Sequence, residues 1–316
     1  MIENTFARDV DEGLSGHPKF LSSKYFYDEN GGKIFQKIMN LPEYYLTDCE
    51  AEIFEENKNK IRRIFNDSTD ESFNLLELGA GDGMKTKILL RHFLLRETQF
   101  TYIPIDIDEA ANETLAKGLK KEFFNLDLKT ISEDYFSALE KVRFDGRRNI
   151  MMFLGSNIGN FTNEEAGRFF RHLRELIKPN DLFLIGFDLK KDPRVILDAY
   201  DDKSGVTKEF NLNLLRRINR ELGADFDIDK FDHFESYNPI SGETKSYIIS
   251  REEQKVRIKS LDRSYEFGEW EPIYTEVSMK YDTGDIDRIA YESGFEVVEN
   301  LFDSKKYFAS SIWRAV

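Results

Sequence analysis

One short stretch limits what this chain can fold into more than any other part of the sequence: an apolar run that meets a glycine-rich turn. The run is Leu75–Leu78, with Glu77 as its one acid, and the turn is Gly79–Gly83. A helical pattern then begins at Lys85. Open α/β sheets bind ligands at loops of this kind, which follow the carboxyl ends of strands. The stretch therefore predicts an α/β sheet with a ligand-binding loop, although an ordinary strand-to-helix connection has the same pattern.

The turn does not match the loops that bind phosphates. The residue order of a P-loop is absent, and Met84 occupies the last glycine position of the dinucleotide fingerprint. Gly79 and Gly81 can adopt positive φ and let a ligand approach the backbone. An acid followed by Gly-x-Gly suits a nucleoside ligand without a pyrophosphate, of which S-adenosylmethionine (SAM) is the common one.

The second predicted strand also ends in acids. Residues 101–107 form an apolar run that contains Asp106, and Asp108 follows. A carboxylate at the end of the second strand can bind both hydroxyls of a ribose. Asp106 is our candidate for that role, with Asp108 in reserve. The alternative is that both acids cap the helix that begins near Glu109.

Composition excludes several classes of function. The chain has 316 residues, 33% of them charged, and a formal net charge of −14. Contacts between basic side chains and phosphates dominate nucleic-acid affinity, so this acidic chain is not expected to bind nucleic acid. An acidic membrane surface would repel the chain as well, so no membrane partner is expected. Cys49 is the single cysteine and the four histidines are scattered, so we expect no disulfide and no metal site. The start lacks an apolar signal core, and we expect a cytoplasmic protein, monomeric in solution.

Strands and helices alternate through the middle of the chain, which predicts a right-handed βαβ series and a doubly wound, mostly parallel sheet. A helix and an antiparallel edge hairpin close the pattern near the end. The predicted strands are 75–78, 101–107, 149–154, 182–189, 295–302 and 307–314, and the helices are 85–95, 109–122, 163–177 and 285–292.

The remaining residues form a second α+β lobe. We expect 1–23 to run extended over the surface and a long helix to end at Phe65. Helices near 194–199 and 204–223 precede antiparallel strands, with a hairpin turn at Asn238–Gly242. The predicted domains are 66–191 with 279–316 for the Rossmann-like sheet, and 1–65 with 192–278 for the second lobe.

Two glycines and two asparagines follow the predicted strand 149–154, in the segment Gly155–Asn160. Strand ends on this side face the ligand crevice of a doubly wound sheet. Asn160 can both donate and accept hydrogen bonds, as a site for an amino-acid backbone requires. The alternative is that Asn160 or Asn163 caps the next helix.

With these motifs, nearly the whole chain resembles the histidine Nα-methyltransferases of ergothioneine biosynthesis. The most specific strings are LPEYY at 41–45, AYDD at 199–202, NREL at 219–222 and TEVS at 275–278. The resemblance implies a class I methyltransferase fold and SAM as the cofactor. It implies transfer of methyl groups to the α-amine of L-histidine, up to the trimethylated product hercynine.

The resemblance also implies the site residues. Glu276 and Ser278 would bind the two imidazole nitrogens, and their spacing places both on one face of a strand. Without the resemblance, Glu276 would simply be an exposed acid. Tyr44 and Asn160 would orient the reacting amine. The implied substrate contacts are Tyr44, Gly155, Asn160, Tyr200, Glu276 and Ser278, and the implied cofactor contacts are Tyr27, Gly79, Gly81, Lys85, Asp106, Asp134 and Tyr135.

Two positions depart from the family pattern. Asn157 stands where Thr is expected, and Ser246 where an apolar residue, often Met, would line the pocket. Three alternatives stay open: the same fold acting on tryptophan or a histidine derivative, a SAM-binding module without catalysis, and, against its charge, a nucleic-acid methyltransferase.

Overall fold

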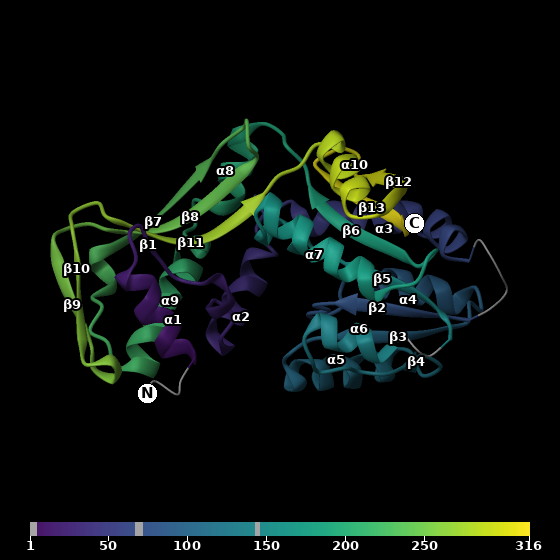
Figure 1. Ribbon diagram of the computed structural model, residues 1–316, viewed down its shortest axis with the longest axis horizontal. Coiled ribbons are helices and arrows are strands. Elements are labelled where there is room, and N and C mark those ends of the chain that lie inside the picture. The colour runs from purple at the N-terminus through teal and green to yellow at the C-terminus, as the bar shows by residue number, and fades with distance from the viewer. Residues whose placement is uncertain (1–4, 67–71, 143–145) are drawn as a thin grey trace. The chain divides into compact units, whose positions relative to one another are not determined.

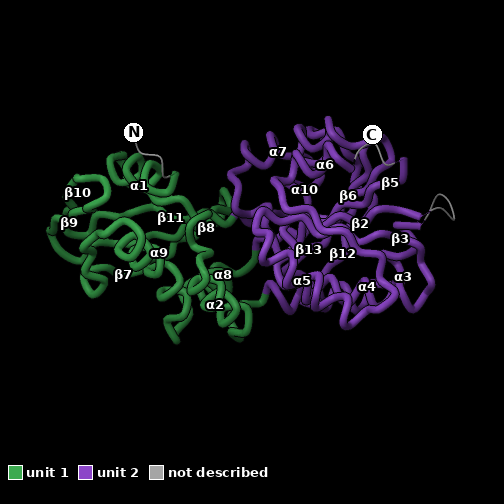
Figure 2. The backbone as a smooth tube through the Cα atoms, turned by 90° about the horizontal axis from the view of Figure 1, so that it is seen from below, with its two compact units in different colours: residues 1–45, 191–278 green, residues 46–190, 279–316 purple. Residues whose placement is uncertain are grey.

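The computed structural model describes residues 5–66, 72–142 and 146–316. The predicted polar linker at 66–72 therefore lies almost entirely outside the described residues. The chain divides into two compact units, coloured separately in Figure 2. Unit 1 comprises Met1–Tyr45 and Lys191–Ser278, and unit 2 comprises Leu46–Lys190 and Met279–Val316. Each unit is described by itself below.

Within its described residues, unit 2 contains a seven-stranded sheet in the order β12-β13-β6-β5-β2-β3-β4 (Figure 1). The pairs from β6 to β4 are parallel, whereas β13 is antiparallel to both β6 and β12. The predicted doubly wound sheet with an antiparallel edge hairpin is confirmed. The strands are β2 (Phe73–Leu78), β3 (Phe100–Ile105), β4 (Asp127–Leu128), β5 (Arg148–Phe153), β6 (Leu182–Asp188), β12 (Phe295–Phe302) and β13 (Phe308–Ala315).

The central strands are buried on both faces. Every residue of β2, β3 and β6 is buried, which is typical of a parallel sheet covered by helices on both sides. The helices of unit 2 are α3 (Leu46–Phe65), α4 (Thr86–Leu95), α5 (Glu109–Glu122), α6 (Tyr135–Val142), η2 (Asn157–Asn160), α7 (Asn163–Leu176) and α10 (Thr283–Glu292). Strand order reverses between β2 and β5, so the loops that follow these two strands adjoin the topological switch point.

Helix α3 belongs to unit 2, whereas the sequence pattern had suggested the second lobe. Its apolar face includes Ile53, Phe54 and Ile61, all fully buried, and the helix packs against α4, β13 and β6. At its end, the Phe65 ring lies 6.0 Å from that of Phe93 in α4. This packing places the division of the chain after Tyr45 instead of after residue 65.

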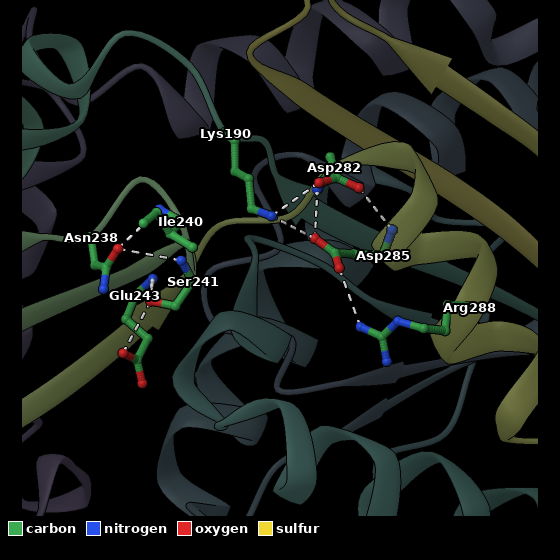
Figure 3. A network of polar contacts seen from close by, with 8 residues as sticks. All are labelled: Lys190, Asn238, Ile240, Ser241, Glu243, Asp282, Asp285 and Arg288. Atoms are coloured by element: carbon green, nitrogen blue, oxygen red, sulfur yellow. Dashed lines mark hydrogen bonds and ion pairs between the residues drawn. The ribbon is translucent and has the colours of Figure 1, made fainter.

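Two segments of unit 2 are joined where β6 ends. Leu189 forms an isolated parallel bridge with Tyr281, and the Tyr281 amide donates to the Asp188 carbonyl at 2.9 Å. The Lys190 ammonium lies 2.9 Å from carboxylate oxygens of both Asp282 and Asp285, which start α10 (Figure 3). These contacts hold the chain before residue 191 beside the chain after residue 279.

Unit 1 is built around a four-stranded sheet in the order β1-β11-β8-β7, with a separate β9–β10 hairpin, within the described residues. The hairpin turn predicted at Asn238–Gly242 is confirmed, because the Gly242 amide donates to the Asn238 carbonyl at 2.8 Å. The Asn238 side chain also accepts from the Ile240 amide (Figure 3). The elements are α1 (Thr5–Ser15), β1 (Lys19–Phe20), η1 (Ser23–Tyr25), α2 (Glu29–Ile38), α8 (Pro193–Tyr200), α9 (Val206–Leu222), η3 (Ile228–Lys230), β7 (Phe231–Tyr237), β8 (Glu243–Ser250), β9 (Gln254–Ile258), η4 (Lys259–Leu261), β10 (Arg263–Phe267) and β11 (Pro272–Met279).

The expectation that residues 1–23 run extended over the surface is wrong. Residues Thr5–Ser15 form α1, whose side chains Phe6, Val10 and Leu14 are buried in the core of unit 1. The apolar positions follow helical spacing, which places them on one face of the helix. The intervening charged residues gave the segment its polar appearance and concealed this face.

Candidate functional site

The loop after β2 has the backbone that its glycines predicted. Gly79 and Gly81 have φ of 71° and 55°, in the left-handed region. A Cβ atom at Gly79 would lie 2.9 Å from the Tyr135 hydroxyl, so any larger residue would require Tyr135 to shift. The chain therefore needs glycine at 79 both for its backbone angle and to leave room for Tyr135.

Of the two acids after β3, one caps a helix and the other accepts from the Asp108 amide and acts electrostatically on Tyr135. Asp108 accepts hydrogen bonds from the amides of Ala110 and Ala111, so it is the N-cap of α5. Burial, and then the negative charge of Asp106, raise the pKa of Tyr135 to about 12. The Tyr135 hydroxyl therefore stays protonated at neutral pH and is available as a donor. Asp106, Tyr135 and Gly79 form one neighbourhood.

Asp134 has a structural task of its own. Its carboxylate accepts from the amides of Phe136 and Ser137, each at 3.1 Å, and from the Ser137 hydroxyl. The Ser137 hydroxyl and amide together hold the pKa of Asp134 below its ordinary value. The predicted acid–aromatic pair is thus present, with its acid capping α6 and its aromatic residue beside Gly79.

A residue that the sequence analysis missed organises the loop after β5. The Glu50 carboxylate, on α3, is fully buried, forms an ion pair with Lys85 and accepts from the Gly155 amide at 2.8 Å. A Cβ atom at Gly155 would lie 3.1 Å from the Lys85 ammonium. The signal was available, because Glu50 lies one helical turn from the buried Leu46 and Ile53, where an acid is unusual.

The alternative assignment of the asparagines as helix caps is excluded. Thr162 is the N-cap of α7, and it forms a capping box with Glu165. Asn160 is exposed at the end of η2. The Asn157 side-chain nitrogen lies 3.6 Å from the position that a Cβ of Gly79 would occupy, so the loops after β2 and β5 approach each other.

The remaining predicted residues lie in unit 1, where they gather from separate segments. The Tyr200 hydroxyl, at the end of α8, lies 2.9 Å from the Ser278 hydroxyl on β11. The rings of Tyr44 and Tyr200 meet edge to face, with centroids 6.5 Å apart. Glu276, two residues before Ser278, acts electrostatically on Tyr27. Substrate-binding candidates therefore lie in both units, since Gly155 and Asn160 belong to unit 2.

Tyr27 is the one predicted cofactor contact that lies in unit 1. Its ring packs edge-on against Phe35 and Phe210, with centroids 5.4 and 5.6 Å away. The residue as a whole is 52% exposed, yet desolvation of its hydroxyl, and then the charge of Glu276, raise its pKa well above the ordinary value. The Tyr27 hydroxyl therefore stays protonated at neutral pH.

Ser246, which departs from the family pattern, faces a carboxylate. Its hydroxyl donates to Glu235 at 2.7 Å, and the same Glu235 oxygen lies 3.5 Å from the His233 ring. The other His233 nitrogen lies 3.8 Å from Asp201, the residue after Tyr200. Unit 1 therefore has a buried polar group where an apolar wall was expected.

Among the described residues, no three His, Cys, Asp or Glu side chains are grouped so as to hold a metal ion. No helix in the described ranges is long and apolar enough to cross a membrane.

The sequence of this chain is similar to those of known methyltransferases. The family described as "histidine-specific methyltransferase, SAM-dependent" matches residues 6–315. Histidine N-alpha-methyltransferase of Mycobacterium tuberculosis is 36% identical over 274 residues, covering 87% of this chain and 84% of that protein. The protein of the same name from Mycolicibacterium smegmatis is 37% identical with equal coverage. An L-tryptophan methyltransferase of Psilocybe serbica is 26% identical over 329 residues, covering 96% of this chain and 91% of that protein.

Proposed function

This chain belongs to the family of histidine-specific, SAM-dependent methyltransferases, and from that premise we propose that it methylates the α-amino group of L-histidine, up to the trimethylated product hercynine. One observation carries the choice of substrate. The acid and the hydroxyl suited to imidazole, Glu276 and Ser278, lie on one strand beside Tyr200. A carboxylate and a hydroxyl can bind both nitrogens of an imidazole at once.

We assign the cofactor to unit 2. The backbone of Gly79 and Gly81 would receive it, Asp106 would bind the ribose hydroxyls, and Tyr135 with Asp134 would border the adenine. The positive φ of both glycines and the closeness of Tyr135 to Gly79 support this assignment. Lys85 would meet the carboxylate of the methionine part, because a lysine ammonium is a compact donor for anions.

Each unit contains candidate residues for the amino acid. In unit 1, Glu276 and Ser278 would read the imidazole, and Tyr200 and Tyr44 would orient the amino-acid end. In unit 2, Asn160 and Gly155 would contribute the polar contacts of the loop after β5. Tyr27, which the family resemblance implies is a cofactor contact, would donate a hydrogen bond from its protonated hydroxyl.

Methyl transfer to a neutral amine needs positioning more than acid–base strength. The sulfonium of SAM is already activated, so orientation of the amine in line with the methyl group supplies most of the rate. The amine loses its proton before each transfer. As methyl groups accumulate, the product becomes a permanent cation, which an aromatic ring such as Tyr44 would stabilise by about 0.5–2 kcal/mol.

Tryptophan is the second candidate substrate. The replacement of an apolar wall by Ser246 and Glu235 is the observation that bears on it. A carboxylate in that wall disfavours indole, because burying a charge against an apolar ring is costly. Competition between histidine, tryptophan and sulfur-bearing histidine derivatives in one turnover assay separates these substrates.

Mass spectrometry of histidine incubated with the protein and SAM tests the reaction directly. We expect mass gains of one, two and three methyl groups. Release of the demethylated cofactor with no methylated amino acid would instead indicate uncoupled turnover, and cofactor binding without release would indicate a non-catalytic module. Either result overturns the proposal.

Substitution of Glu276 tests the specificity. Glu276→Ala removes a charge-assisted hydrogen bond of roughly 1.5–3 kcal/mol, so kcat/KM for histidine should fall about 10- to 150-fold. SAM affinity, measured by calorimetry, should persist. Glu266→Ala is the matched control, since Glu266 is an exposed strand acid of unit 1. Unchanged histidine turnover in Glu276→Ala would show that the imidazole is read elsewhere.

A further inference from the structure

We infer that Glu50 is a positioning residue that fixes Lys85 and the Gly155 amide together, and so sets the affinity for both ligands. The inference rests on the proposed function, which gives Lys85 to the cofactor and Gly155 to the amino acid. Glu50 contacts neither ligand in this assignment. It acts through the Lys85 ammonium and the Gly155 amide, which follow β2 and β5.

The geometry concentrates both contacts on one oxygen. Oε2 of Glu50 is paired with the Lys85 ammonium and accepts from the Gly155 amide at 2.8 Å. Lys85 opens the helix after β2, and Gly155 begins the loop after β5. These strands are neighbours at the switch point of the sheet. A single carboxylate therefore connects the two loops where a doubly wound sheet binds its ligands.

Burial of the other Glu50 oxygen, Oε1, costs folding free energy. Oε1 is shielded from solvent and has no hydrogen-bond partner, and the Glu50 side chain has no exposed surface. A Cβ atom at Gly186 on β6 would lie 2.4 Å from Oε1, so the absence of a side chain at 186 makes the space that Oε1 occupies. A buried carboxylate with an unsatisfied oxygen destabilises the fold. A purely structural role would be served better by an apolar side chain, whereas a charge is needed to orient an ammonium.

The two partners need such orientation. The lysine side chain is flexible and its ammonium can rotate, so an unpaired Lys85 would populate many positions. The Gly155 amide precedes an unusual turn, in which Gly155 and Ser156 both have left-handed φ, at 71° and 58°. The Ser156 hydroxyl accepts from the Asp188 amide at 3.2 Å and secures the far side of the turn. At the start of the same turn, Glu50 holds the Gly155 amide by a hydrogen bond.

The test compares Glu50→Gln with Glu56→Gln, an exposed acid on the same helix. Glutamine keeps the shape and removes the charge, so Lys85 loses its ion pair and the Gly155 amide loses a charged acceptor. We expect SAM affinity, measured by calorimetry, to fall about tenfold and KM for histidine to rise about tenfold, with kcat changed less. Glu56→Gln should change neither. Losses confined to kcat, or to stability alone, would overturn the inference.

A double-mutant cycle with Lys85→Met separates this inference from the proposed function. If Lys85→Met leaves SAM affinity unchanged, the cofactor assignment itself is wrong. If Lys85→Met weakens SAM and Glu50→Gln does not, the assignment stands and the Glu50 inference is wrong. If both weaken SAM and the effects are clearly less than additive, Glu50 acts through Lys85.

Glu50→Asp provides the same test if the glutamine variant does not fold. Aspartate keeps the charge on a shorter side chain, which cannot reach both partners from the α3 backbone. Weaker binding of both ligands in a variant with a wild-type melting profile supports the inference. Wild-type affinity for both ligands contradicts it.

Discussion

The two units carry their candidate ligand-binding residues in different ways. In unit 2 the residues lie on loops that directly follow strands of one sheet, and backbone shape matters as much as side-chain chemistry. In unit 1 the candidates are aromatic, hydroxyl and acidic side chains brought together from around residues 27, 44, 200 and 276. The first arrangement follows from topology, and the second follows from long-range packing. Substitutions in the glycine loop of unit 2 and at Tyr200 of unit 1 should therefore affect cofactor and amino acid separately.

Gly79→Ala is expected to have the largest effect on SAM affinity, and it tests whether backbone shape governs cofactor binding in unit 2. The new Cβ would lie 2.9 Å from the Tyr135 hydroxyl at a residue with φ of 71°. We expect SAM affinity to fall at least tenfold, on the order of a 1.4 kcal/mol loss or more. Gly118→Ala, in an open position on α5, is the control and should bind normally. Normal SAM binding by Gly79→Ala would show that the loop backbone is not decisive.

Glu77→Gln tests a buried acid beneath the same loop. Burial raises the pKa of Glu77 from 4.5 to about 7, although hydrogen bonds from Tyr102 and Thr86 oppose the shift. The folded state thus binds the proton more tightly than the unfolded state. Stability from this group is complete below pH 4.5 and is lost as pH rises through 7, by roughly 3 kcal/mol at most.

Denaturant unfolding between pH 4.5 and 8 measures this contribution. The free energy of unfolding of the wild type should fall across that range relative to the glutamine variant, which has no proton to lose. If the two proteins respond to pH in parallel, Glu77 is ionised in the folded state throughout.

Tyr200→Phe is expected to have the smallest effect, and it tests the side-chain arrangement of unit 1. The change removes the hydroxyl that lies 2.9 Å from Ser278. Loss of one such hydrogen bond, about 0.5–1.5 kcal/mol, should raise KM for histidine about 2- to 12-fold and leave SAM affinity unchanged. Tyr25→Phe is the control, because its hydroxyl bonds Asp9 elsewhere in unit 1. Weaker SAM binding by Tyr200→Phe would contradict the separation of the two ligands.

The same difference explains what the sequence could predict. The parallel sheet was predictable because strands, glycine turns and helices recur locally, and the position of Asp106 after β3 follows from that order. Capping also resolves locally, as Asp108 and Thr162 illustrate, once the helix starts are known. These inferences use short stretches of chain.

Long-range packing decided what the sequence could not predict. The amphipathic face of α1 was concealed by the charged residues between Phe6 and Val10, and only the core of unit 1 reveals its use. The local pattern predicts the long helix ending at Phe65, but nothing local specifies its neighbour, so the sequence places it in the wrong unit. The sequence marks Glu50 as an acid on an apolar helix face, but its partners, Lys85 and Gly155, are distant in sequence and could not be predicted.

The junction at which Leu189 pairs with Tyr281 has a consequence for how such a chain tolerates enlargement. Residues 191–278 leave and rejoin the sheet at adjacent points, held there by Lys190 and its two aspartates. A long excursion with fixed, neighbouring ends costs little additional closure entropy as it lengthens, since that cost grows only with the logarithm of length. Insertions within residues 191–278 should therefore destabilise the sheet of unit 2 only slightly.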